Sequence, residues 1–246
     1  MTRDFHDVEN WVLGEVLRYQ AGALVDKRCI EIDGGASLTY AQANHQANQI
    51  ARFLAALGVA PGDRVAVFLP NSLAYCQAWF GIAKAGAVLV AINTEYKGEF
   101  LRHVLINSQA RILVGDVQYL DRIAAIEGEL PELETVLIPG WDGQTPFKRL
   151  RCAAFDDFAR HTESEPGVTV TYRDTASIMY TSGTTGPSKG VLMPHAHNYL
   201  FALGTIEHMS LSEKDVFYIV LPLFHANGLF MQLYATLIAG ATAFIR

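Results

Sequence analysis

The sequence has 246 residues; half of them are hydrophobic, 18% are charged, and the formal net charge is −6. This composition is typical of a globular protein with a sizeable core, and it excludes a long disordered or low-complexity segment. The acidic balance argues against a general nucleic-acid-binding protein, which normally carries a basic face. It is compatible with one local site for an anionic nucleotide with Mg²⁺ as a counter-ion.

In the first half of the chain, predicted helices and strands alternate. Thr39 can cap a helix whose apolar face begins at Ala43 and which Gly58 ends. Ser72 can cap a second helix that ends at Gly86. Further helices are predicted near 98–106 and 120–126, and strands at 64–69, 88–92, 111–114 and 135–138. This alternation predicts parallel sheets with helical crossovers.

The second half begins with residues 139–169, which are more polar, carry turn signals and are expected on the surface. Strands are predicted at 176–180, 191–193, 216–220 and 242–245, and helices at 197–209 and from 228 to about 240. The uncharged stretch 228–245 is long enough to cross a membrane. Its polar residues divide it into a buried helix and a strand, so no membrane span is expected.

The cysteines and the amino terminus indicate the compartment. Cys29, Cys76 and Cys152 are far apart and form no C-x-x-C pair, so neither a disulfide framework nor a zinc site is expected. Cys76 lies in an apolar stretch and is predicted to be a small core residue. Residues 1–7 lack the apolar core of a signal peptide, so a cytoplasmic protein is expected.

The segment from Thr181 to Lys189 is rich in serine, threonine and glycine and joins two predicted strands. Glycines let a backbone approach a ligand closely, successive N–H groups can form a nest for phosphate oxygens, and Lys189 adds a positive charge. A polar surface turn is the alternative, but the length of the segment and its lack of acidic residues favour a phosphate-binding loop. Its spacing differs from the P-loop G-x-x-x-x-G-K-[ST]. It contains no G-x-G-x-x-G, and the chain has no G-x-S-x-G elbow.

The order of residues in this loop resembles the phosphate-binding motif of the adenylate-forming superfamily: acyl- and aryl-CoA synthetases, firefly-type luciferases and peptide-synthetase adenylation domains. Three further segments resemble the family in the same order, at 38–40, 84–93 and 221–225. Within the superfamily, the sequence is most similar to bacterial CoA ligases such as those for crotonobetaine or carnitine. One departure lies at the end of the loop, where Pro187 precedes Ser188 and the family has Gly-x-Pro-Lys-Gly. Lys189 keeps its place, so we expect a tolerated variant.

The resemblance implies an α/β fold of stacked parallel-sheet subdomains, approximately 40–190 and 1–39 plus 191–246. Family members are much longer and end in a small, mobile carboxy-terminal domain. Residues 1–246 are therefore expected to form the incomplete amino-terminal part of the AMP-binding large domain. The carboxy-terminal domain is expected to be absent, and the chain alone to be inactive as a ligase.

The implied reaction has two steps. A carboxylate attacks the α-phosphorus of ATP to give an acyl-adenylate, and coenzyme A then displaces AMP. By resemblance, the ATP contacts are Thr181, Ser182, Gly183, Thr184, Thr185, Gly186 and Lys189, and Thr184 or Thr185 helps to hold Mg²⁺. Lys189 would offset the charge of the phosphates. Two opposite charges about 4 Å apart attract by on the order of 4 kcal/mol at an effective dielectric near 20, before the cost of desolvation.

The acyl substrate is expected near the turn at 221–228. The resemblance places His225 beside the substrate carboxylate as the catalytic residue, with Asn227 and Gly228 at the border of the acyl pocket. A structural histidine bonded to a backbone carbonyl is the alternative for His225. His195 and His197 have a spacing typical of metal ligands but no acidic or cysteine partner nearby, so they are expected to be loop and helix-cap residues.

The expected partners are a small carboxylate, ATP and coenzyme A, and a homodimer is left open. Two other functions stay open beside the CoA ligase. One is a peptide-synthetase adenylation domain that loads a carrier protein, and the other is a non-catalytic nucleotide-binding module.

Overall fold

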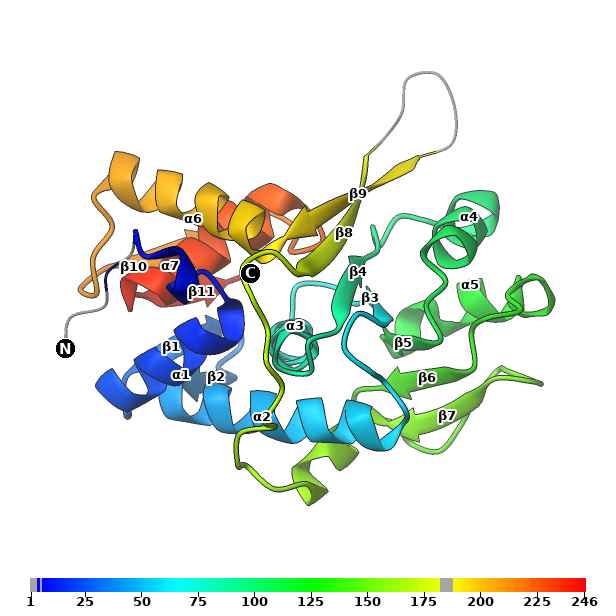
Figure 1. Ribbon diagram of the computed structural model, residues 1–246. Coiled ribbons are helices and arrows are strands. Elements are labelled where there is room, and N and C mark those ends of the chain that lie inside the picture. Colours follow the sequence, from blue (N-terminus) through cyan, green and yellow to red (C-terminus); the bar gives the residue numbers. More distant parts are fainter. Residues whose placement is uncertain (1–3, 5, 182–187) are drawn as a thin grey trace.

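The computed structural model describes residue 4, residues 6–181 and residues 188–246. Two β-sheets lie on either side of a set of helices, and the carboxyl end of the chain lies near the middle of the molecule (Figure 1). The predicted α/β fold with parallel sheets is confirmed.

The larger sheet has seven strands in the order β7-β6-β5-β3-β4-β8-β9. They are β3 (Arg64–Phe68), β4 (Val88–Ala91), β5 (Ile112–Gly115), β6 (Thr135–Ile138), β7 (Arg151–Ala154), β8 (Thr175–Thr181) and β9 (Lys189–Pro194). All neighbouring strands are parallel except β8 and β9, which pair antiparallel. β8 and β9 extend together beyond the body of the sheet (Figure 1).

The smaller sheet joins the two ends of the chain. Its order is β10-β11-β1-β2, with β1 (Arg28–Ile32), β2 (Ser37–Thr39), β10 (Val216–Ile219) and β11 (Thr242–Ile245). β1 pairs with β11 in parallel, although more than 200 residues separate them along the chain. The expected division into 40–190 and 1–39 plus 191–246 stays a prediction, and all of β9 lies in the larger sheet.

Helices α2 and α3 begin directly after their predicted capping residues, Thr39 and Ser72. The full set of helices is α1 (Leu13–Ala23), α2 (Tyr40–Ala56), α3 (Leu73–Lys84), α4 (Gly98–Ser108), α5 (Leu120–Ala124), α6 (His195–Met209), the π-helix η5 (Asn227–Tyr234) and α7 (Ala235–Ala239). Short 3₁₀ turns are η1 (Val8–Asn10), η2 (Val117–Tyr119), η3 (Glu127–Glu129) and η4 (Phe155–Arg160). Thr39 and Gln42 form a reciprocal capping box at α2, and the Ser72 hydroxyl accepts the Tyr75 N–H at α3.

Two cores lie on the two faces of the larger sheet, because alternate residues of each strand point to opposite faces. On β4, Leu89 and Ala91 join one core, and Val88 and Val90 join the other. The first core also contains Ile30 of β1, so it fills the space between the two sheets. The second packs the sheet against α4 and α5.

The predicted helix and strand at 228–245 are confirmed as η5, α7 and β11. Among the described residues, no helix has the length and apolar character needed to cross a bilayer.

The prediction that residues 139–169 lie on the surface is partly wrong. β7 adds an edge strand to the larger sheet, and Phe155 and Phe158 of η4 are buried. Polar residues around these two rings hid the short strand and the turn. The prediction also contained no element for α1 or β1.

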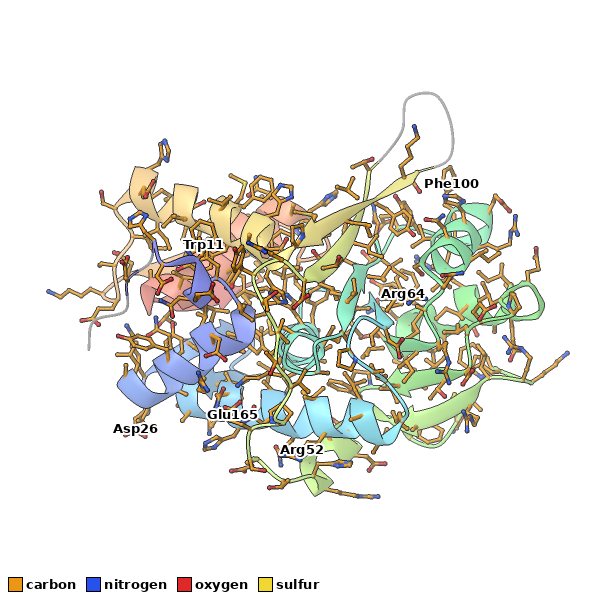
Figure 2. All side chains as sticks on the ribbon, viewed as in Figure 1. Trp11, Asp26, Arg52, Arg64, Phe100 and Glu165 are labelled. Carbon is orange, nitrogen blue, oxygen red and sulfur yellow. The ribbon has the colours of Figure 1, made fainter. Side chains whose placement is uncertain are left out.

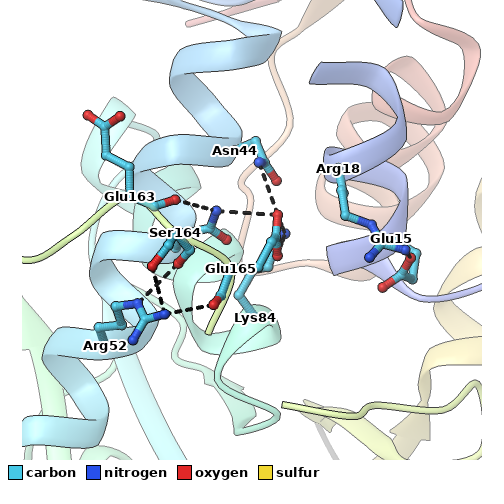
Figure 3. A network of polar contacts seen from close by, with 9 residues as sticks. Glu15, Arg18, Asn44, Arg52, Lys84, Glu163, Ser164 and Glu165 are labelled. Carbon is cyan, nitrogen blue, oxygen red and sulfur yellow. Dashed lines mark hydrogen bonds and ion pairs between the residues drawn. The ribbon is translucent and has the colours of Figure 1, made fainter. Parts of the chain in front are cut away.

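A polar network fastens residues 163–165 over α2 and α3 (Figures 2 and 3). Lys84 Nζ donates to both Glu165 carboxylate oxygens, at 2.9 and 2.7 Å. Asn44 and Asn48 of α2 donate to the same carboxylate at 3.3 Å. Arg52 donates to the backbone carbonyls of residues 164 and 165. The connection from β7 to β8 is therefore tied to the helices between the sheets.

Candidate functional site

A cleft of about 260 Å³ opens at the carboxyl ends of β4 and β8. Its lining residues are Ala91, Asn93, Tyr96, Tyr180, Phe224 and His225. The carboxyl ends of parallel strands are where open α/β sheets bind ligands. The cleft therefore lies at the end of the sheet where a substrate site is expected.

The described ends of the predicted phosphate loop lie next to this cleft. Tyr180 lines the cleft, and Thr181 follows it at the end of β8. Thr181 pairs with Lys189 across the β8–β9 ladder, and both residues are exposed. Ser182, Gly183, Thr184, Thr185 and Gly186 lie outside the described residues, as do the two predicted Mg²⁺ contacts among them.

Helix α4 contacts the strands on both sides of this loop. The Tyr180 hydroxyl donates to Asn107 Oδ1 at 2.8 Å. His103, one turn earlier on α4, has its Nε2 2.7 Å from the Ser188 carbonyl oxygen. A carbonyl oxygen can only accept, so His103 Nε2 carries the hydrogen. Burial raises the pKa of Tyr180 to about 12, so its hydroxyl remains a donor at neutral pH.

His225 lies on the turn between β10 and η5, exposed to the cleft. Its ring centroid is 4.8 Å from that of Phe224, and its backbone carbonyl accepts the first hydrogen bond of η5, from Leu229. π-Helical turns such as η5 often mark functional sites. The imidazole is therefore placed where a ligand in the cleft can meet it.

Asn227 and Gly228 are placed differently from His225. Neither residue lines the cleft. Asn227 is exposed, and its Oδ1 accepts a hydrogen bond from Gln232. Gly228 is buried, and a Cβ built on it would lie 2.5 Å from the Pro222 carbonyl oxygen. Because Gly228 has no side chain, two backbone segments can pass closely at this point.

Two residues from the start of α3 hold the turn that carries His225. Asn71 Oδ1 accepts the Leu223 N–H at 2.8 Å, and Asn71 Nδ2 donates to the Leu221 carbonyl at 3.1 Å. The Tyr75 hydroxyl donates to the Leu223 carbonyl at 3.0 Å. The connection from β3 to α3 and the first turn of α3 therefore fix a turn that follows a strand of the smaller sheet.

The remaining candidates lie away from the cleft. His195 and His197 occupy the first turn of α6; His195 is buried, and His197 stacks on Phe201 with centroids 5.0 Å apart. Burial lowers the pKa of His195 to about 4, although the charge of Asp174 opposes this shift. Cys76 is buried in the core as predicted, and burial raises its pKa well above its usual range. Within the described part of the chain, no group of three or more His, Cys, Asp or Glu side chains is arranged to hold a metal ion.

An α/β fold with a cleft at the carboxyl ends of parallel strands is typical of ligand-binding domains. The sequence profile of the AMP-binding enzyme family matches residues 17–246, and the chain belongs to this family. The predicted family resemblance is thereby confirmed.

Curated relatives include the long-chain-fatty-acid–CoA ligase FadD13 of Mycobacterium tuberculosis, 35% identical over 81% of this chain and 38% of its own length. The crotonobetaine/carnitine–CoA ligase of Salmonella enteritidis is 33% identical over 77% of this chain and 37% of its own length. The chain thus spans under two fifths of the length of these relatives.

Among solved structures, the anthranilate–CoA ligase AuaEII in complex with anthranoyl-AMP superposes with a TM-score of 0.88 at 28% identity. The match covers 96% of this chain and 45% of that chain.

Sequence analysis missed several residues around the cleft. Asn93 and Tyr96 line it from the connection after β4, and Asn71 and Tyr75 hold its histidine turn. Asn93 ends a segment that resembles the family, which was the one available signal. Asn71 acts through a hydrogen bond to Leu221, which lies 150 residues further along the chain, and nothing in the sequence around Asn71 indicates that contact.

Proposed function

We propose that this chain is the amino-terminal part of an acyl-CoA ligase. The enzyme would activate a carboxylic acid with ATP as an acyl-adenylate and transfer the acyl group to coenzyme A. One observation supports this proposal most directly: Tyr180 lines the cleft, and the next residue, Thr181, begins the hydroxyl-rich loop. This succession puts the loop's entry at the wall of the cleft that His225 faces.

In this proposal, the loop residues bind the nucleotide and His225 binds the carboxylate substrate. Lys189 and the loop hydroxyls and N–H groups would bind the β- and γ-phosphates, which offsets the charge that develops on the leaving pyrophosphate. His225 would orient the substrate carboxylate by a hydrogen bond. Mg²⁺, held with help from Thr184 or Thr185, would neutralise phosphate charge.

The nucleotide part of the proposal is tested with Lys189→Ala in the whole enzyme. We expect Lys189→Ala to weaken the binding of ATP with Mg²⁺ about tenfold or more, because it removes a charged hydrogen-bond donor. Lys214→Ala is the matched control, since Lys214 is an exposed lysine on the connection before β10. Calorimetric titration with ATP and Mg²⁺ measures both variants. Unchanged affinity in Lys189→Ala contradicts the assigned role of the loop.

Two assays separate the competing functions. Carboxylate-dependent exchange of pyrophosphate into ATP distinguishes an enzyme from a non-catalytic nucleotide-binding module. Formation of acyl-CoA, against loading of a carrier protein, distinguishes a CoA ligase from an adenylation domain. The names of the relatives define a first carboxylate panel: long-chain fatty acids, carnitine, crotonobetaine and ferulate.

A cytoplasmic location belongs to the same proposal, and a homodimer stays open. Cell fractionation and sedimentation of the whole enzyme would test them. The 246-residue chain alone is expected to show little ligase turnover, which acyl-CoA assays of the isolated chain and the whole enzyme compare directly.

A further inference from the structure

We infer that Asn71 is a positioning residue that holds His225 toward the substrate cleft. Because His225 has a substrate role only in the proposed ligase, this inference rests on the proposed function. Asn71 itself does not line the cleft. It acts through the backbone of the turn between Leu221 and His225.

The hydrogen-bonding groups of Asn71 match the turn in both directions. Its side-chain oxygen accepts from the N–H of Leu223, and its side-chain nitrogen donates to the carbonyl of Leu221 and, at 2.9 Å, to that of Arg246. A primary amide is both donor and acceptor, so one side chain satisfies all three groups. Asn71 thereby joins the ends of β3, β10 and β11, which belong to two different sheets.

The turn has little freedom to find another position. Leu223 is fully buried, so its N–H and carbonyl need partners inside the protein. Asn71 satisfies the first and the Tyr75 hydroxyl satisfies the second. On the other side, Gly228 packs directly under the Pro222 carbonyl. His225 therefore lies two residues after Leu223, in a turn that Asn71 and Tyr75 hold on one side and Gly228 packs against on the other.

A double-mutant cycle tests this positioning in the whole enzyme. Asn71→Leu keeps the side-chain size and removes all three hydrogen bonds, and His225→Ala removes the imidazole. The readout is pyrophosphate exchange with whichever carboxylate of the panel reacts fastest. We expect Asn71→Leu to lower kcat/KM for that carboxylate about tenfold when His225 is present. The same change should cost less than twofold when His225→Ala is already in place, because residues that act as one unit are not additive.

The KM for ATP separates positioning from general damage. Asn71→Leu should leave it within twofold of the wild-type value, since the hydrogen bonds of Asn71 run to the turn and to Arg246, whereas the proposed phosphate contacts lie on the loop between β8 and β9. Gln77→Leu is the matched control: Gln77 also lies on the α3 segment and donates a 2.8 Å amide hydrogen bond, but to Gln46 and away from the turn. It should leave both KM values unchanged. If Asn71→Leu fails to fold, Tyr75→Phe, which deletes one oxygen, takes its place in the cycle.

Each outcome decides between the two proposals. Additive losses in the cycle, or equal losses for ATP and carboxylate, overturn the positioning role and leave the ligase function intact. Full activity in the His225→Ala variant overturns the positioning role as well, because no imidazole would then need positioning. A wild-type enzyme without carboxylate-dependent exchange refutes the ligase function, and the inference falls with it.

Discussion

At the scale of single residues, the site depends on backbone approach as much as on reactive side chains. His225 reaches the cleft because the segment 221–225 folds back over the start of η5, and Gly228 is the residue that permits this contact. A side chain at residue 228 would meet backbone atoms, which cannot rotate away as a flexible side chain can.

We therefore expect Gly228→Ala to destabilise the protein by about 1–3 kcal/mol, the usual cost of overpacking. It should also raise the KM for the carboxylate, since the turn has to shift. Gly204→Ala is the control, because Gly204 lies inside α6 and a Cβ added there would meet open space. That change should be neutral or stabilising by up to about 1 kcal/mol. Urea unfolding of both variants measures the difference; equal stability of the two would contradict the packing at residue 228.

At the scale of elements, a partly buried ion pair lies at the centre of the polar network that holds the connection from β7 to β8. The side chain of Lys84 is 5% exposed, whereas that of Glu165 is 43% exposed. Burial lowers the pKa of Lys84 despite its carboxylate partner. Burial alone would raise the pKa of Glu165, but the hydrogen bonds and charge of Lys84 and the two asparagines hold it below the usual value of 4.5. The pair therefore depends mainly on Glu165 remaining ionised.

We expect Glu165→Gln to lower the free energy of unfolding at pH 7 by about 1–2 kcal/mol, because it removes the hydrogen-bonded counter-charge of a buried ammonium. The exposure of Glu165 and the remaining charge of Glu15 moderate the loss. A carboxyl group whose pKa is lower in the folded state stabilises it above its unfolded pKa and loses that effect as the pH falls through the folded value. The difference between Glu165→Gln and wild type should therefore be full above about pH 4.5 and shrink below it.

The combined variant Lys84→Met with Glu165→Gln serves as the control for this ion pair. It should recover part of the stability at pH 7, since neither side chain of the former pair then carries a charge. Urea unfolding between pH 7 and pH 3.5 measures all three proteins. A stability loss that does not change with pH would show that charge is not the cause.

At the scale of the whole molecule, elements that local sequence determines were predicted better than elements that depend on long-range contacts. The capping residues Thr39 and Ser72 and the continuous apolar run of β4 fix helices and strands within the sequence around them. β1, by contrast, is half exposed and pairs with β11 at the other end of the chain, so its stability comes from a partner that its own sequence does not indicate.

The candidate site divides in the same way. His225 and the hydroxyl-rich loop have recognisable local sequences. In the structure, His225 lines the cleft, and Thr181, the first residue of the loop, directly follows the cleft residue Tyr180. Asn71, Tyr75 and Asn93 gain their positions only when the two sheets come together. Residues that act through tertiary contacts were therefore the ones that sequence analysis missed.

The arrangement of the smaller sheet makes one further prediction for the 246-residue chain. β10 is an edge strand, paired only with β11 in the described part of the chain. On its outer face, Val216, Tyr218 and the following Val220 are 66%, 52% and 55% exposed. An apolar, unpaired edge is a template for association with other strands. The isolated chain should therefore self-associate as its concentration rises.

Lysine on this edge should suppress the association, because a charge at a strand edge opposes pairing. We expect Val216→Lys with Val220→Lys to shift the isolated chain toward monomer in sedimentation velocity runs across a range of concentrations. Met209→Lys is the control, since Met209 is 60% exposed at the end of α6 and lies outside any strand. It adds charge without touching the edge and should leave the association in place. If wild type and the Val216→Lys, Val220→Lys variant sediment alike, the outer face of β10 does not drive association, and the apolar side chains there are tolerated as ordinary surface.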